Sequence, residues 1–427
     1  GAHRSCSSAL RASGMISDLL KTLLWSGFSP KEAAEHAGCT TRYAREIAKN
    51  EGISRATSNG DQPSREQLDA MVEEVVRDCG HDYGRKMLLG ALRARYPRYT
   101  FSRSSLQESM TRVFPQAANA RRYWTRRRLM RDHYSAPHFM YSMHLDLNGK
   151  LQEYGLFVGA AVDGDSRMVL RLHVLTNKLA ATVYTQVFLP AVEQYGLPDQ
   201  TLTDKGSEML VISFVCHHLQ MLTGLFGFVA RQAHRFIPST RNVRVEKFNG
   251  EINVRVIKPF KLLLMYMEEV GFLDIADSLQ LGVIQLLGRP LLQFACDQLS
   301  AAWAEHYVSN KAGNGGIPVQ RMLQRPHPGH QLQIPHDYDG VQNYEQHSGR
   351  QLDRDPEWAA ARDPLVQDTQ AQLHREAVVM QIWGSTRAAW QDVLHGSGTI
   401  FIKSYGVILK MHQDAAPPAV APPAASI

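Results

Sequence analysis

The order of repeating patterns between residues 139 and 203 constrains the fold more than any other feature of this chain. Met143, Leu145 and Leu147 alternate with polar residues, which is the period of a half-buried β-strand. Strand patterns occupy residues 143–147, 154–162 and 168–174. A helical pattern follows at 179–195 and a further strand pattern at 201–203. With the helical pattern that follows, this β-β-β-α-β-α order predicts an α/β core whose sheet mixes antiparallel and parallel pairs. It excludes a pure doubly wound sheet and a β-sandwich.

Residues 15–54 have the spacing of short, compact helices. Gly27 ends the first helix, and Ser29 and Pro30 supply an N-cap and a first-turn proline for the second. A break at 37–39 precedes a third helix, which is typical of a helix-turn-helix. The third helix carries side chains that can reach phosphates and base edges, namely Arg42, Tyr43, Arg45 and Lys49. DNA binding is the favoured interpretation, and a plain helical bundle with a basic face is the alternative.

A second helical unit is predicted over residues 64–113, and an arginine-rich segment follows it. Its arginines, which are interleaved with aromatic residues, include Arg121, Arg122, Arg126, Arg127 and Arg128. Such a segment suits the DNA phosphate backbone, where each contact releases counterions. A nuclear-import signal and a solvated helix face are the alternatives, and neither excludes DNA binding.

The charge of the chain is concentrated in the same region. Lys and Arg number 47 against 41 Asp and Glu, which gives a net charge of +6. Residues 1–140 hold 23 Lys and Arg against 14 Asp and Glu, so the remainder of the chain is slightly acidic. We therefore expect a polyanionic partner at the N-terminal third.

Membrane and secreted proteins fit this sequence poorly. It has no run of 18 apolar residues and no charged-then-apolar leader at its start. The five cysteines are odd in number and widely scattered, which favours a reducing compartment. A zinc site built from His36, Cys39, Cys79 and His81 would lack a second C-x-x-C motif. Helix-packing thiols are therefore the favoured interpretation.

The sequence after residue 325 is rich in His, Gln and Asp and is expected to be loosely structured. A largely apolar helical region is expected before it, over 258–307. A helical stretch is expected again between 358 and 395, followed by a β-prone patch over 399–410. The Pro/Ala-rich end, 415–427, is expected to be disordered.

Two aspartates stand where a metal site can be assembled. Asp146 lies inside the first strand pattern, where a buried carboxylate needs a cation or access to solvent. Asp204 follows the strand pattern at 201–203, and ligands of α/β sheets bind at the carboxyl ends of strands. Asp163, in contrast, is expected to support the turn at Ser166 rather than bind metal.

Glu246 lies on a predicted helix with two stripes of the same period. The apolar stripe is Val245, Phe248, Ile252 and Val256, and the polar stripe is Asn242, Glu246, Asn249 and Asn253. A polar stripe beside an apolar one can face a cleft. Glu251 is the rival acid, but a five-residue step turns it roughly 140° away from the polar stripe.

In this order, Asp146, Asp204 and Glu246 resemble the catalytic carboxylates of DDE integrases and transposases of the retroviral-integrase type. The phrases VDGDSR and DKGSE, with Trp303 and the GIP at 316–318, resemble motifs of integrase-core proteins of eukaryotic mobile elements. The resemblance covers roughly residues 80 to 325. The chain departs from it in an enlarged spacing between the last two carboxylates and in the absence of a recognisable His/His/Cys/Cys zinc module. Asn249 also stands where a Trp is frequent.

The resemblance implies a fold, a metal pair and a partner. The fold is an α/β, RNase H-like mixed sheet with flanking helices. Two Mg²⁺ or Mn²⁺ ions are implied, with Asp146 bridging both, Asp204 holding one and Glu246 the other. DNA is the implied partner of a homo-oligomer, nuclear in a eukaryotic cell and otherwise cytoplasmic. Lys205 and Asn242 are expected to contact DNA, although a solvated loop lysine is equally compatible with Lys205.

These expectations favour a DNA recombinase that cleaves and joins strands. A domesticated, catalytically inactive DNA-binding protein with the same fold is the main alternative. A structure-specific nuclease is a third possibility, which needs a fourth carboxylate. Four domains are predicted. They are a helix-turn-helix-like unit (1–60), a second helical unit with its arginine-rich linker (64–135), a catalytic core with a helical extension (139–325), and a loosely structured C-terminal region (326–427).

Overall fold

The computed structural model describes most of the chain. The described residues are 16–24, 30–51, 61–80, 82–114, 136–222, 231–309, 315–328, 333–354 and 362–415. The arginines of the predicted 121–128 segment and the Pro/Ala-rich residues 416–427 lie outside them. Among the described residues, no helix combines the length and the apolar character needed to cross a bilayer.

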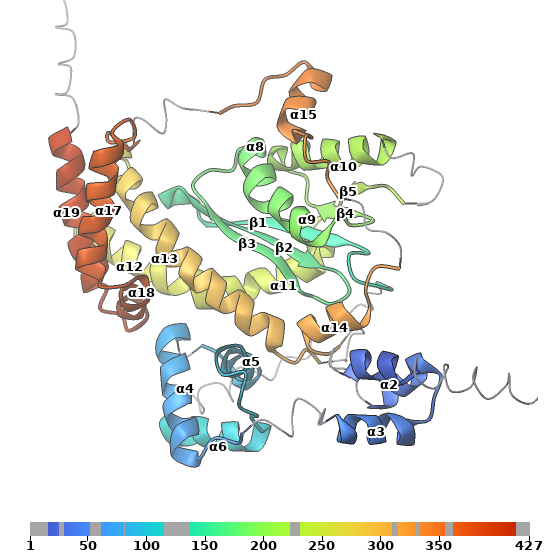
Figure 1. The fold of residues 1–427 in the computed structure, drawn as a ribbon. Helices are drawn as coiled ribbons and strands as arrows, with labels where there is room; N and C mark the ends of the chain where they lie inside the picture. The colour runs from blue at the N-terminus through green and yellow to red at the C-terminus, as the bar shows by residue number, and fades with distance from the viewer. Residues whose placement is uncertain are drawn as a thin grey trace, which may run out of the picture.

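A five-stranded sheet in the order β3-β2-β1-β4-β5 forms the centre of the molecule (Figure 1). The strands are β1 (Met143–Leu151), β2 (Leu156–Asp163), β3 (Val169–Leu175), β4 (Thr201–Thr203) and β5 (His234–Phe236). The first three strands pair antiparallel, whereas β4 pairs parallel with both β1 and β5. The mixed sheet and the order of its first four strands are thus confirmed. The three-residue strand β5 was not predicted.

Helices cover both faces of this sheet. One face carries Met143 and Leu145 of β1 and packs against α8 (Ala180–Val183), η2 (Tyr184–Phe188), α9 (Leu189–Tyr195) and α10 (Leu210–Leu222). The other face packs against α11 (Val243–Ile252), α12 (Lys258–Glu269) and the long α13 (Ser278–Glu305). A π-helical turn, η6 (Asn253–Ile257), joins α11 to α12. The alternation in β1 therefore directs Asp146 and its polar neighbours toward α11.

The N-terminal helices form two groups. A helical segment at 16–24, α2 (Pro30–Ala37) and α3 (Thr41–Asn50) share a small core of their own, and Gly38 between the last two has φ +63°. The second group is α4 (Arg65–Cys79), α5 (Arg85–Arg95) and α6 (Arg103–Val113). Its α5 lies against α13 so closely that a Cβ on Gly90 would be 2.2 Å from the Ala302 carbonyl oxygen. The second group therefore belongs to the main core.

The C-terminal region is more ordered than its composition suggested. It contains α14 (Pro318–Gln324), α15 (Gly340–Ser348), α17 (Thr369–Trp383), α18 (Thr386–Leu394) and α19 (Thr399–Ala415). The last three pack beside α13 and share its core (Figure 1), so the prediction of a loosely structured region is wrong for them. The helical stretch expected between 358 and 395 is confirmed in its described part.

The predicted β-prone patch at 399–410 is also wrong, because this segment is α19. Phe401, Tyr405, Ile408 and His412 are all buried, and their spacing of four, three and four residues is that of one helix face. The β-branched residues of the segment suggested a strand, but burial against α13 and α17 decides the conformation.

The VDGDSR turn between β2 and β3 is fixed from several sides. Asp163 accepts hydrogen bonds from the Ser166 backbone and hydroxyl, as expected of a turn carboxylate. Trp303 of α13 donates its indole N–H to the Arg167 carbonyl at 2.8 Å. The fully buried Asp165 pairs with Arg321 of α14. The VDGDSR turn therefore contacts both Trp303 and α14, the helix that begins at Pro318 of the GIP phrase.

Candidate catalytic carboxylate site

The three predicted carboxylates come from two neighbouring strands and one helix. Asp146 lies in the middle of β1, where its strand partner on β2 is Ala160. Asp204 directly follows β4, the strand that pairs parallel with β1. Glu246 lies in the first turn of α11, which packs on β1 and β2. The fold thus brings residues that are 100 positions apart to one edge of the β1–α11 interface.

Three polar pairs join β1 to α11 and its continuation. The His144 Nδ1 atom lies 2.7 Å from Asn242 Oδ1, and Asn249 Nδ2 donates to Asp146 Oδ2 at 2.8 Å. Asn148 Nδ2 donates to Asn253 Oδ1 at 2.9 Å. Every second residue from His144 to Asn148 therefore has a partner on the polar stripe of the helix. The apolar stripe of α11 is buried as predicted.

Mutual repulsion shows that the carboxylates lie within electrostatic reach of one another. Burial raises the pKa of Asp146 to about 7, and the negative charges of Asp204 and Glu246 add to this rise. The pKa of Glu246 is raised by burial and then by Asp204, and that of Asp204 by burial and then by Glu208. Carboxylates that oppose one another's ionisation in this way are stabilised by a bound cation.

Two oxygens at this site fit such a cation. Asp204 Oδ1 and Asn249 Oδ1 are buried and have no hydrogen-bond partner among the described residues. Both atoms can only accept, so a hard, oxygen-preferring ion such as Mg²⁺ or Mn²⁺ would satisfy them. The carboxylates are not packed within 4.8 Å of one another as a single-ion cage would be.

Two residues of the site were not assigned to it from the sequence. Asn249 was placed on the polar stripe, but its direct hydrogen bond to Asp146 depends on the helix packing. Glu208, the last residue of the DKGSE phrase, lies in the first turn of η3 (Ser207–Met209). Its charge raises the pKa of Asp204, so it is a fourth carboxylate beside the site. The D-x-x-x-E spacing in DKGSE was the available signal.

Asn242 does not have the role predicted for it. Its side chain is fully buried, its Nδ2 donates to the Leu145 carbonyl at 3.2 Å, and its Oδ1 faces His144. Burial lowers the pKa of His144 to about 4, so the neutral ring donates from Nδ1 to this oxygen. The expected DNA contact is therefore wrong, because both ends of the amide are committed inside the protein. The rival acid Glu251 pairs with Arg255 instead.

The other predicted DNA contacts are accessible where they are described. Arg42, Arg45 and Lys49 are exposed on α3, and Tyr43 is half-buried against the small N-terminal core. Lys205, next to Asp204, is exposed. The five predicted contacts between Arg121 and Arg128 lie outside the described residues.

A basic groove lies between α5, α6 and α11 and was not anticipated. It has a volume of about 630 Å³, and its positively charged lining residues are Arg85, Lys86, Lys247 and Arg255. Tyr307 also lines it, with the Lys86 and Arg103 cations over its ring. Basic and aromatic side chains of this kind suit a nucleic acid strand. Lys247 and Glu251 line it from α11, on a face of the helix other than that of Glu246.

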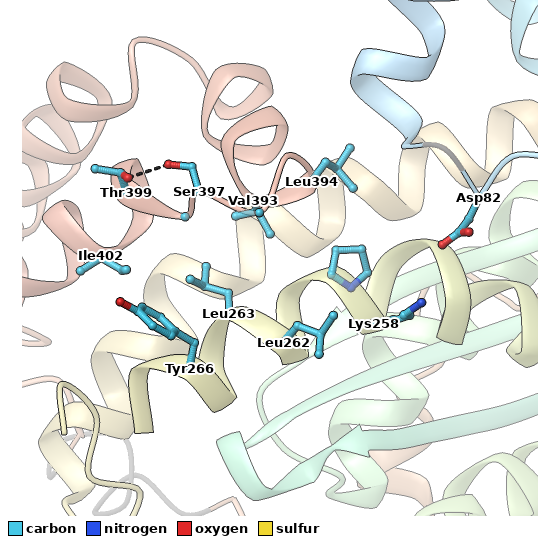
Figure 2. Close-up of a pocket in the computed structure, with 13 residues that line it drawn as sticks. Asp82, Lys258, Leu262, Leu263, Tyr266, Val393, Leu394, Ser397, Thr399 and Ile402 are labelled. Atoms are coloured by element: carbon cyan, nitrogen blue, oxygen red, sulfur yellow. Dashed lines mark hydrogen bonds between the residues drawn. The ribbon is translucent and has the colours of Figure 1, made fainter. Parts of the chain in front are cut away.

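A pocket of about 720 Å³ lies elsewhere, between α12 and the turn from α18 to α19. Leu262, Leu263 and Tyr266 line it from the helix side, and Leu394 and Ile402 face them (Figure 2). It contains none of the predicted catalytic residues, and its lining is largely apolar. The carboxylate site is therefore the stronger candidate for chemistry.

We expect Asn249→Ala to weaken Mn²⁺ binding about 10- to 100-fold, because the hydrogen bond that orients Asp146 and favours its charged form is lost. Calorimetric titration with Mn²⁺ measures the effect. Asn253→Ala is the matched control, since it removes the neighbouring pair with Asn148 and no contact to a carboxylate. Equal losses in the two variants would contradict a positioning role for Asn249.

Comparison with known proteins agrees with this geometry. Residues 133–325 match a family model described as an integrase core domain. No curated protein matches the chain. The match spans the sheet, α11 and α13, and ends just after α14, so the expected RNase H-like mixed sheet with flanking helices is confirmed. The match supports an integrase-core catalytic domain of the DDE type over residues 133–325.

Proposed function

We propose that this protein is a DNA recombinase that cleaves and joins DNA strands with the help of Mg²⁺ or Mn²⁺. An integrase core domain implies polynucleotidyl transfer and DNA binding in general terms. The observation that carries the finer proposal is the electrostatic proximity of Asp146, Asp204 and Glu246 at a site with two buried oxygens that have no hydrogen-bond partner in the described part of the chain. A stability role alone gives no reason to bury like charges together.

The residues of the site would have two roles, metal binding and positioning of the Asp146 carboxylate. Asp146, Asp204 and Glu246 would hold the metal ions. Such ions stabilise the entering and leaving oxygens of an in-line phosphodiester displacement. Asn249 and the Leu147 N–H hold the Asp146 carboxylate in place through one hydrogen bond to each oxygen. Attack by water gives strand cleavage, and attack by a DNA 3′-hydroxyl gives strand transfer.

DNA would be held by basic surfaces of the chain. The exposed cations of α3, Lys205 and the basic groove beside α11 offer phosphate contacts on the described part of the chain. Recombination joins two DNA ends, so we propose a homo-oligomer on DNA. Since DNA is the partner, we propose that the protein acts in the nucleus of a eukaryotic cell and otherwise in the cytoplasm.

The proposal is tested by metal-dependent nicking of supercoiled plasmid and joining of a labelled DNA end. We expect activity with Mn²⁺, none with EDTA, and a loss of at least about 100-fold in Glu246→Gln. Glu251→Gln is the matched control, because this acid lies on the same helix and pairs with Arg255. Equal activity of wild type and Glu246→Gln would refute the assignment.

Two other functions make different predictions. A domesticated DNA-binding protein would keep its function after joint replacement of Asp146, Asp204 and Glu246. A structure-specific nuclease is favoured by one observation, the proximity of Glu208 to Asp204. It predicts faster cleavage of RNA–DNA hybrids or junctions than of duplex DNA, no joining, and a large loss in Glu208→Gln.

A further inference from the structure

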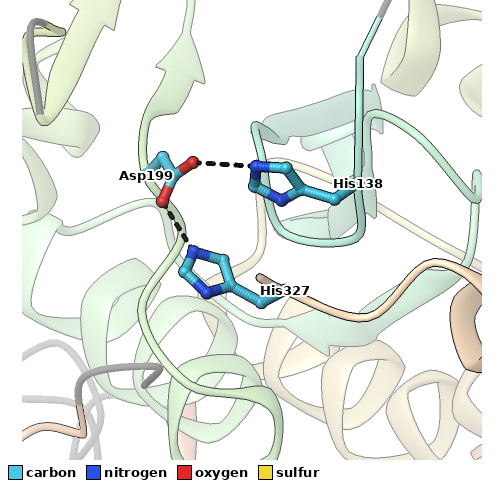
Figure 3. A group of neighbouring side chains, drawn as sticks. All are labelled: His138, Asp199 and His327. Carbon is cyan, nitrogen blue, oxygen red and sulfur yellow. Dashed lines mark hydrogen bonds and ion pairs between the residues drawn. The ribbon is translucent and has the colours of Figure 1, made fainter. Parts of the chain in front are cut away.

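A second group of metal-ligating side chains lies at the opposite end of the sheet. His138 precedes β1, Asp199 precedes β4 and His327 follows α14 (Figure 3). Asp199 Oδ1 lies 2.8 Å from His327 Nε2, and Asp199 Oδ2 lies 3.5 Å from His138 Nε2. One ligand atom from each residue falls within 4.8 Å of the other two, which holds for no other such group in the described residues.

A hydrogen bond at Nδ1 of His138 determines which tautomer this ring adopts, and that tautomer leaves Nε2 able to bind a metal. His138 Nδ1 lies 3.0 Å from the Phe139 carbonyl oxygen, which can only accept, so Nδ1 carries the hydrogen. In a neutral ring, Nε2 then presents a lone pair toward Asp199. Two acceptors facing each other at 3.5 Å require a cation between them or a second proton on the ring. A ligating histidine whose other nitrogen donates to a backbone carbonyl is the usual arrangement in zinc sites.

From this geometry we propose that His138, Asp199 and His327 bind a divalent transition-metal ion of the zinc class. Two imidazoles and one carboxylate are a donor set that Zn²⁺ accepts, with a fourth position left for water. Mg²⁺ prefers oxygen ligands alone and is better served by the DDE carboxylates. The three side chains are only 15 to 19% exposed, so the ion would be partly enclosed.

The site would tie three segments of the chain together. Backbone hydrogen bonds already join them, from Asp199 N to the Met140 carbonyl and from Phe139 N to the Arg325 carbonyl. The ion would add a crosslink between the sheet and the segment after α14. Asp199 and Asp204 flank opposite ends of β4, on the order of 15 Å of extended chain apart. The proposed site is therefore separate from the DDE carboxylates and does not depend on their activity.

The test uses the full chain with Asp146→Asn, Asp204→Asn and Glu246→Gln, so that the DDE carboxylates no longer compete for metal. After treatment with EDTA and dialysis, the protein is titrated with Zn²⁺ by calorimetry and with Co²⁺ by visible absorption. We expect the parent protein to bind one ion. This binding should be lost, or weakened at least about tenfold, when His327→Ala or His138→Gln is added. His336→Ala is the matched control, because this nearby histidine is exposed and outside the group.

The thermal midpoint gives a second, independent readout. Zinc that binds only the folded chain raises the midpoint of the parent and of the His336→Ala variant, and leaves that of the His327→Ala variant unchanged. Circular dichroism checks that each variant is folded, and His327→Gln replaces His327→Ala should the latter fail. The proposal is overturned if the parent takes up no zinc, or if His327 and His138 variants bind it as the parent does.

Discussion

Asp146→Asn is expected to abolish cleavage and joining while DNA binding stays intact. The substitution keeps the shape of the side chain and one accepting oxygen for the Leu147 N–H, and Asn249 can turn its amide to accept from the new NH2 group, but the charge that would hold the ions is removed. A loss of at least about 10³-fold, or roughly 4 kcal/mol of transition-state stabilisation, is expected. Plasmid nicking and end joining with Mn²⁺ measure activity, and a gel-shift or fluorescence-anisotropy titration measures DNA binding.

The same variant separates chemistry from folding. Since burial and neighbouring charges raise the pKa of Asp146 to about 7, the neutral amide should fold at least as stably as the wild-type chain without metal. A thermal midpoint equal to or above that of the wild type is therefore expected in EDTA. Full activity of a folded Asp146→Asn protein would contradict the catalytic role of this carboxylate.

Arg321→Met is expected to lower the free energy of unfolding by about 3–5 kcal/mol, because it leaves the fully buried Asp165 without its main partner. Arg321 Nη2 lies 2.6 Å from Asp165 Oδ1, and its Nε donates to the Asp165 carbonyl at 3.2 Å. Urea unfolding followed by tryptophan fluorescence measures the change.

Arg325→Met provides the matched comparison for this ion pair. Arg325 also approaches Asp165 Oδ1, at 3.2 Å, but its side chain is 40% exposed. A smaller effect, of about 1 kcal/mol or less, is expected since an exposed partner contributes little. If the two arginine variants were equally stable, the proposed dependence of the VDGDSR turn on Arg321 would be wrong.

The sequence predicted those elements whose periodicity is expressed over several residues. The alternation at Met143, Leu145 and Leu147 located β1, and the apolar stripe of α11 located the helix that carries Glu246. Strands β4 and β5 span only three residues each, which is too short for a period to be visible. The two β-branched threonines of β4 still indicated a strand, whereas β5 has no β-branched residue and was missed. In α19, the helical spacing from Phe401 to His412 was present, but β-branched neighbours obscured it.

The contents of the site were less predictable than its position. Asn242 and Asn249 lie on the same polar stripe, yet one is sealed inside the protein and the other holds Asp146. Sequence spacing predicts which residues share a face of a helix, but not how deeply each of them is buried against the sheet. Likewise, His138, Asp199 and His327 are far apart in the chain, and only the meeting of their segments brings them together.

The three polar pairs between β1 and the polar stripe of α11 bear on how this chain tolerates insertions. Side chains on a strand alternate, so sliding the strand by one residue would turn all three of its polar partners away from the helix together. The position of Glu246 relative to Asp146 is consequently set by this docking rather than by the length of chain before the helix. An insertion between α10 and β5 is thus expected to leave the spacing of the two carboxylates unchanged.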